Sequence, residues 1–173
     1  PPWRHTRAMV ELGTSASRRG GFLGVLMLDT LFPRPPGDIG NPETFRRAGI
    51  PVRYRIVAGA SPQRVVREAD ARLLDPFVDA ARELVRDGAA MLTTSCGFLA
   101  AWQGELAQAV PVPVVTSSLL QCREHVHPGI VTFDADSLTA DLLATAGVPV
   151  GTPVAGVAPG CEFHTRILGN HDQ

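Results

Sequence analysis

A continuous apolar run, FLGVLML at residues 22–28, is the feature that most constrains the fold. Seven apolar residues without alternation are typical of a strand that is covered on both faces in a parallel sheet. The same order of apolar run, polar tip and helical pattern recurs, with runs at AAMLTTS (89–95) and IVTFDA (130–135). Strands that alternate with helices in this way predict an α/β fold with an open parallel sheet and flanking helices.

Further strands are expected at 51–60, at 112–118 and near 152, and a helix beginning at Asp75-Pro76 and ending before Gly88. The length of 173 residues predicts one domain or two small lobes. Residues 1–20 are expected to form a mobile N-terminal arm.

The composition excludes several classes of function. All 16 basic residues are arginine, and a chain without lysine has no Schiff-base lysine and no P-loop lysine. The net charge of -1 gives no reason to expect nucleic acid, and no apolar run has the length of a membrane span. Three widely spaced cysteines are neither a disulfide framework nor a metal motif, which favours the cytoplasm.

Polar residues follow the expected strands at the points where these strands end. They are Asp29-Thr30, Thr93–Cys96 and Thr116–Ser118. In open parallel sheets, ligands bind at the carboxyl ends of the strands, so these tips predict a pocket for a small ligand.

Cys96 stands at the end of one such tip and just before a helical pattern. A helix N-terminus stabilises a thiolate, so we expect a lowered pKa for Cys96 and a role as base or nucleophile. The hydroxyls of Thr94 and Ser95 and the nearby N–H groups would hold a carboxylate, and Gly97 leaves room for it. The alternative is a buried cysteine that packs as a small hydrophobe.

Three segments together resemble the aspartate/glutamate racemase superfamily. They are LDTLFPRPPGDIGNPETF (28–45), TTSCGFLA (93–100) and PVVTSSLLQ (113–121), and they are most similar to a branch with a PGDIGNP-x-TF opening. The resemblance implies two pseudo-symmetric α/β lobes around a cleft, with a first lobe over 21–120 and the start of a second, incomplete lobe over 121–173. It also implies racemisation without a cofactor, in which two cysteines act on opposite faces of the substrate carbon.

The resemblance assigns roles to residues of this chain. Cys96 matches the first family cysteine and is the catalytic candidate. The second family cysteine is expected beyond Gln173, and Cys161 precedes that position, so the chain is expected to be truncated. The candidates for substrate binding are Thr94, Ser95, Gly97, Ser117, Ser118, Asp29, Arg34, Asp38 and Asn41.

The leading hypothesis is therefore an amino-acid racemase for aspartate, glutamate or a related small acid. It needs no cofactor and no metal, its partner is a small carboxylate or amino acid, and it is compatible with a homo-oligomer. One-thiol decarboxylation or isomerisation is an alternative, and so is a carboxylate-binding module or an inactive fragment. We expect Cys122 to be partly buried, and His125 and His127 to lie in a solvated loop rather than at a metal.

Overall fold

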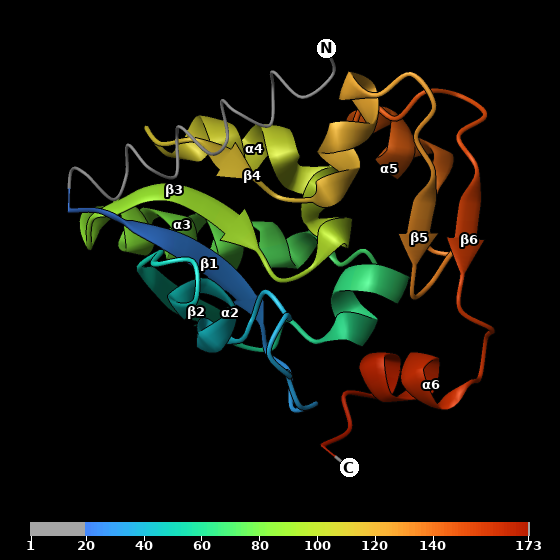
Figure 1. Cartoon of the computed structure of the whole chain (residues 1–173), viewed down its shortest axis with the longest axis horizontal. Helices are drawn as coiled ribbons and strands as arrows, with labels where there is room; N and C mark the ends of the chain where they lie inside the picture. Colours follow the sequence, from blue (N-terminus) through green and yellow to red (C-terminus); the bar gives the residue numbers. More distant parts are fainter. Residues whose placement is uncertain (1–19, 173) are drawn as a thin grey trace.

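A computed structural model describes residues 20–172 of the chain, so most of the predicted arm at 1–20 lies outside the described residues. Its centre is a four-stranded sheet in the order β2-β1-β3-β4 (Figure 1). The strands are β1 (Phe22–Leu28), β2 (Val52–Val57), β3 (Ala89–Thr94) and β4 (Val114–Val115), and every pairing is parallel. The predicted open parallel α/β sheet is confirmed.

A second, two-stranded parallel sheet follows in the chain. It pairs β5 (Ile130–Thr132) with β6 (Val154–Gly156) and lies beside the end of the larger sheet where β1 and β3 terminate (Figure 1). Two helices accompany it, α5 (Ala140–Thr145) and α6 (Glu162–Gly169). The division of the chain into lobes at residues 20 and 120 stays a prediction.

The helices of the first sheet differ in detail from the sequence expectation. Helix α3 (Leu74–Arg86) ends as expected before Gly88, whose φ of +100° suits a glycine. Its entrance is a short 3₁₀ turn, Ala71–Leu73, which Asp70 caps by accepting a hydrogen bond from the Arg72 N–H. The predicted cap at Asp75 is therefore wrong, because the chain is already helical there.

The remaining helical segments are short. Helix α2 (Pro42–Arg46) lies in the loop after β1, and a π-helical turn, Gln63–Arg67, follows β2. The helix expected after Cys96 is divided into a 3₁₀ segment, Gly97–Trp102, and α4 (Gln103–Ala109). Another 3₁₀ segment, Ser118–Glu124, follows β4. None of the helices described is both long and apolar enough to cross a membrane.

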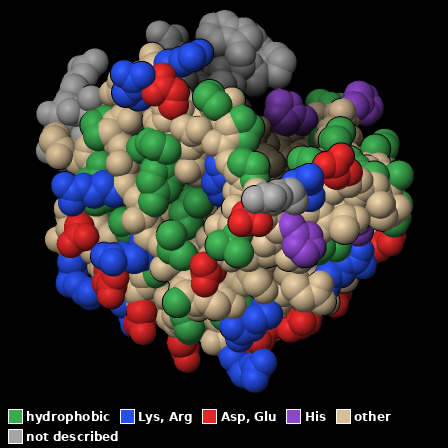
Figure 2. All heavy atoms as spheres, turned by 90° about the horizontal axis from the view of Figure 1, so that it is seen from below, with side chains coloured by type: hydrophobic (Ala, Val, Ile, Leu, Met, Phe, Trp, Pro, Cys, Tyr) green, Lys and Arg blue, Asp and Glu red, His purple; other side chains and the backbone are tan. Residues whose placement is uncertain are grey.

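The main core lies between the four-stranded sheet and α3. Leu26 of β1 and Leu92 of β3 meet Phe77 and Leu84 of the helix, and all four side chains are almost completely buried. The arginines of β2 and α2 are on the surface, where Arg55 pairs with Glu83 and Arg46 with Glu43. Figure 2 shows such basic and acidic side chains interspersed along the rim of one face, beside a hydrophobic patch.

Gly24 is required by the packing of β1 on α3, which leads to a stability prediction. A Cβ at this position would lie 2.5 Å from Leu92 Cδ2 and 3.1 Å from Leu84 Cδ1. We expect Gly24→Ala to lower the free energy of unfolding by about 1–3 kcal/mol, the usual cost of overpacking. Urea denaturation followed by circular dichroism measures this change.

Gly104→Ala is the matched control for Gly24→Ala. Gly104 lies in α4 with no neighbour within 4 Å of the added Cβ, so alanine should stabilise the helix by about 0.5–1 kcal/mol. Equal stability of the Gly24→Ala variant and the parent chain would contradict the packing described for β1.

Candidate active site

A cavity of about 640 Å³ opens at the carboxyl ends of β1 and β3. Parallel pairing brings these ends together, since Leu26 of β1 lies opposite Thr94 of β3. The wall also includes residues of β5 and α6, so the cavity lies between the two sheets. Its volume is in the usual range for a small-molecule site. The predicted candidates in its wall are Cys96, Ser95, Gly97, Ser117, Ser118, Arg34 and Asp38.

Cys96 directly follows the tip of β3 and has extended backbone geometry, with the 3₁₀ segment beginning at Gly97. Only 9% of Cys96 is exposed, and it packs with the main core while lining the cavity. Gly97 brings this tip close to the next one, because a Cβ on Gly97 would lie 3.1 Å from Ser117 Oγ. The thiol is thus held in a narrow place between two strand tips.

The pKa of the Cys96 thiol is raised to about 11, chiefly because burial penalises the charged thiolate. The backbone N–H groups of Phe98 and Leu99 and the charge of Arg34 act in the opposite direction but are outweighed. The expected lowering of this pKa is therefore wrong. The sequence argument was correct that backbone N–H groups after Cys96 lower the pKa of its thiol. It did not include burial, which raises this pKa by more.

A buried hydrogen-bond network fixes the two tips. The Thr94 hydroxyl lies 2.9 Å from the carbonyl oxygen of Cys96 and 2.7 Å from that of Thr116. The Gln103 amide donates to the carbonyl of Val114, and its oxygen accepts from the N–H and the hydroxyl of Thr116. Gln103 thus satisfies backbone groups on either side of Val115. Strand β4 is shorter than the strand predicted over 112–118.

Thr94 has a position different from the one that the sequence suggests. Its side chain is buried, its hydroxyl bridges the strand tips, and it does not line the cavity that contains Cys96. Ser95 does line this cavity, although its hydroxyl already accepts a hydrogen bond from the Leu28 N–H. The network described here shows Thr94 in contact with backbone atoms, where it holds the thiol-bearing turn in place.

Arg34 supplies a positive charge to the cavity wall. Its Nη1 donates to Asp38 Oδ1 at 2.8 Å, its Nη2 donates to Thr30 Oγ1 at 3.0 Å, and its guanidinium carbon lies 4.7 Å from the centre of the Phe32 ring. The Nε atom is buried without a hydrogen-bond partner among the described residues. A guanidinium has five N–H donors, so this side chain keeps donors for a carboxylate.

The GDIGN loop builds the support for Arg34. A Cβ on Gly40 would lie 2.5 Å from Arg34 Cδ, so glycine is needed for the side chain to fit. Asn41 caps α2 and donates from Nδ2 to the Arg34 carbonyl at 2.6 Å. Asp29 instead accepts a hydrogen bond from the Gly59 N–H at 2.9 Å. Neither Asn41 nor Asp29 lines the cavity.

Several wall residues were not predicted as site residues. Cys122, buried in the 3₁₀ segment after β4, and His125 line the cavity on one side, and Phe98 and Phe133 line it on another. Their spacing in sequence gave no signal, because they meet only through the packing of the two sheets. Within residues 20–172, no group of three or more His, Cys, Asp or Glu side chains is arranged to hold a metal.

An ion pair connects the two sheets behind this wall. Arg67, in the turn after β2, lies 2.7 Å from the Asp134 carboxylate, which is 2% exposed and also accepts from Ser137. The same guanidinium lies 3.3 Å from Nε2 of His164 in α6. Residues adjacent to this pair in sequence, Val66 and Phe133, line the cavity, so the ion pair fixes the position of that wall.

Comparison with solved structures supports the fold class. The Gly74Cys mutant of arylmalonate decarboxylase, solved in a sulfate-associated form, matches with a TM-score of 0.51 and 20% identity. The match covers 79% of this chain and 62% of that one. At this identity the likeness shows the fold alone, which agrees with the predicted α/β fold and its open parallel sheet.

Two curated proteins are similar in sequence, and no protein-family model matches. Dimethylsulfoniopropionate lyase 7 of Emiliania huxleyi is 32% identical over 120 residues, which is 66% of this chain and 34% of the relative. Dimethylsulfoniopropionate lyase of Durusdinium sp. clade D is 34% identical over 99 residues, or 56% of this chain and 32% of the relative. The chain thus spans about a third of the length of these curated relatives.

The raised pKa of Cys96 predicts a loss of stability at alkaline pH. Between the ordinary value of 9.0 and about 11, the thiol ionises in the unfolded chain but stays protonated in the folded one. Unfolding then releases a proton, so stability is full below pH 9 and falls as the pH rises to 11. The expected loss is on the order of 2 kcal/mol.

Urea denaturation at pH 8, 9, 10 and 11 measures this loss, and Cys96→Ser should remove most of it. The chain suits the test because it has no lysine and a single tyrosine, Tyr54, whose own raised pKa gives a residual slope of the same sign. Cys161→Ser, at the start of α6, changes the number of thiols equally and should keep the parent slope. A slope that is the same with and without Cys96 would contradict the burial argument.

Proposed function

We propose that the chain carries the base of a cofactor-independent enzyme that removes a proton from the carbon next to a carboxylate. The reaction that we favour is a β-elimination, as in a dimethylsulfoniopropionate lyase. The observation that carries the proposal is the Cys96 thiol in the wall of a cavity that also contains the Arg34 guanidinium. Such a cavity can hold a carboxylate at one point and remove a proton at another.

The elimination needs one base. The thiolate of Cys96 takes the proton from the carbon next to the carboxylate, and the electrons of that C–H bond form the double bond to the next carbon. The bond from that carbon to sulfur breaks, and its electron pair leaves with neutral dimethyl sulfide. Acrylate remains, and Cys96 passes its proton to solvent. Arg34 would stabilise the negative charge that develops on the carboxylate.

Similarity in sequence supports the lyase over the racemase of the initial hypothesis. Two relatives named as dimethylsulfoniopropionate lyases match this chain over 120 and 99 residues. Racemisation needs a second proton donor on the opposite face of the carbon, whereas elimination ends when the leaving group departs. A single thiol therefore completes the elimination but only half of a racemisation.

Racemisation is kept as a second candidate because of Cys122. Its thiol lines the same cavity as Cys96, so the wall contains two thiols. Two acid–base groups of one kind are what inversion at a carbon requires. Loss of optical activity from L-aspartate or L-glutamate, with deuterium incorporated from D₂O, would support this candidate.

The lyase is tested with dimethylsulfoniopropionate as substrate. Dimethyl sulfide is measured by gas chromatography and acrylate by NMR, and the two should form in equal amounts. Cys96→Ser should lower kcat/KM at least about 100-fold, because it removes the base. Cys161→Ser should be as active as the parent chain, since Cys161 does not line the cavity.

Two results would overturn the lyase proposal. One is release of dimethyl sulfide that is unchanged in Cys96→Ser, which would place the base elsewhere. The other is no release from the chain under conditions where urea denaturation shows that it is cooperatively folded. Racemisation of an amino acid by such a sample would move the assignment to the second candidate.

A further inference from the structure

We propose that the cavity selects carboxylates whose other end is a fully alkylated cation, a sulfonium or a quaternary ammonium, and that Phe98 and Phe133 bind this cation. The inference rests on the proposed function and extends it to a substrate class. It distinguishes these substrates from α-amino acids, which carry a primary ammonium. The argument uses the aromatic residues of the wall, its charges, and the state of the thiol.

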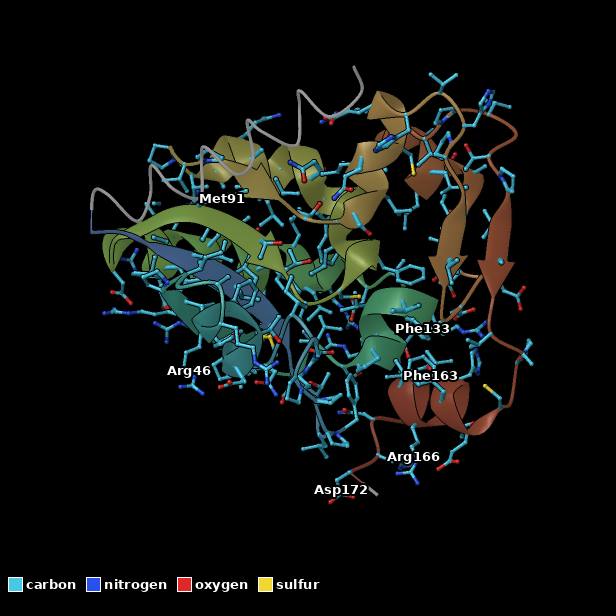
Figure 3. The ribbon with its side chains drawn as sticks, in the orientation of Figure 1. Arg46, Met91, Phe133, Phe163, Arg166 and Asp172 are labelled. Atoms are coloured by element: carbon cyan, nitrogen blue, oxygen red, sulfur yellow. The ribbon has the colours of Figure 1, made fainter. Side chains whose placement is uncertain are left out.

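Phe98 and Phe133 form an aromatic pair in the cavity wall. Their ring centres are 5.7 Å apart and the ring planes are inclined by 71°, an edge-to-face arrangement. Phe98 comes from the turn after Cys96, and Phe133 follows β5, between the two sheets (Figure 3). Aromatic faces attract cations and are the common means of binding quaternary ammonium groups.

The wall has no acid available for a primary ammonium. Of the described residues that line the cavity, Asp38 is the one acid, and it is paired with Arg34 at 2.8 Å. Asp134, next to Phe133 in sequence, is buried, paired with Arg67 and absent from the wall. A primary ammonium has three N–H donors that need acceptors, whereas a fully alkylated cation has none. The wall therefore offers a primary ammonium no free carboxylate, only neutral acceptors such as Ser118 and Gln121, whereas a fully alkylated cation needs no acceptor.

A bound cation would also supply what Cys96 lacks. Burial keeps the thiol protonated well above neutral pH. An opposite charge within about 4–6 Å favours the charged form of a buried group and lowers a thiol pKa by about 1–3. A substrate with a cationic end next to Phe98, two residues from Cys96, would thus promote formation of the base that acts on it.

Three carboxylates that share a propionate chain test the selectivity by isothermal titration calorimetry. They are β-alanine betaine, its carbon isostere with tert-butyl in place of trimethylammonio, and β-alanine. We expect the betaine to bind about 3- to 30-fold more tightly than the isostere, the range of a desolvated cation–π contact. We expect β-alanine to bind more weakly than both.

Substitutions locate the cation site. Phe133→Leu should remove most of the preference for the betaine while affinity for the isostere changes little, and Phe133→Tyr should retain the preference. Phe163→Leu is the matched control, because Phe163 lies on α6 with 57% of its surface exposed and outside the cavity (Figure 3). If Phe163→Leu loses the preference for the betaine as fully as Phe133→Leu does, the assignment of the cation site to Phe133 is overturned.

A second measurement follows the thiolate by its ultraviolet absorbance at fixed pH, with Cys96→Ser as blank. The betaine should increase the thiolate signal of Cys96, and the isostere should not. Equal or tighter binding of the isostere by the parent chain overturns the inference whatever the variants do. Such a result, together with Cys96-dependent release of dimethyl sulfide, would leave the lyase intact. A clear betaine preference without any turnover would leave the cation site intact and reject the lyase.

Discussion

The parallel pairing of β1 with β3 is the constraint on which the site depends. It places Leu26 opposite Thr94, so the GDIGN loop after one strand and the thiol after the other start from the same edge of the sheet. Arg34 and Cys96 are 62 positions apart in the chain, yet both line one cavity. An antiparallel pairing would send these two segments to opposite edges and separate the charge from the thiol.

The second sheet completes the wall of the cavity. It contributes Phe133 and residues of β5, and the ion pair between Arg67 and Asp134 holds it against the turn after β2. Enclosure by the two sheets buries Cys96 and raises the pKa of its thiol, while Arg34 opposes this effect. The Cys96 thiol is therefore protonated near neutral pH. A cationic substrate in the cavity would lower the pKa of this thiol and favour the thiolate.

The sequence predicted the features that depend on local pattern. The apolar run of β1, the tip that carries Cys96, and the glycine that ends α3 all follow from residue type and spacing. The local pattern did not predict contacts between residues that are distant in sequence. No pattern showed that the Thr94 hydroxyl would bond to the Thr116 carbonyl, or that the Gln103 amide would bond to the backbone of Val114 and Thr116.

Desolvation was the effect most difficult to foresee. The helix-terminus argument for Cys96 used only local backbone geometry, and the burial that reverses the sign comes from segments distant in sequence. The roles of Asn41 and Asp29 were not predicted for the same reason. Each forms a hydrogen bond with a backbone group near the site and does not line the cavity. Phe98 and Phe133 become a pair only after the two sheets have packed.

The central claim is that the Cys96 thiolate removes a proton from the carbon next to a carboxylate. Exchange of that proton for deuterium in D₂O, followed by NMR on β-alanine betaine, measures this step without the departure of a good leaving group. The account predicts exchange that is catalysed by the parent chain and by Cys161→Ser, and that is lost in Cys96→Ser. Exchange at the same rate in Cys96→Ser would contradict it.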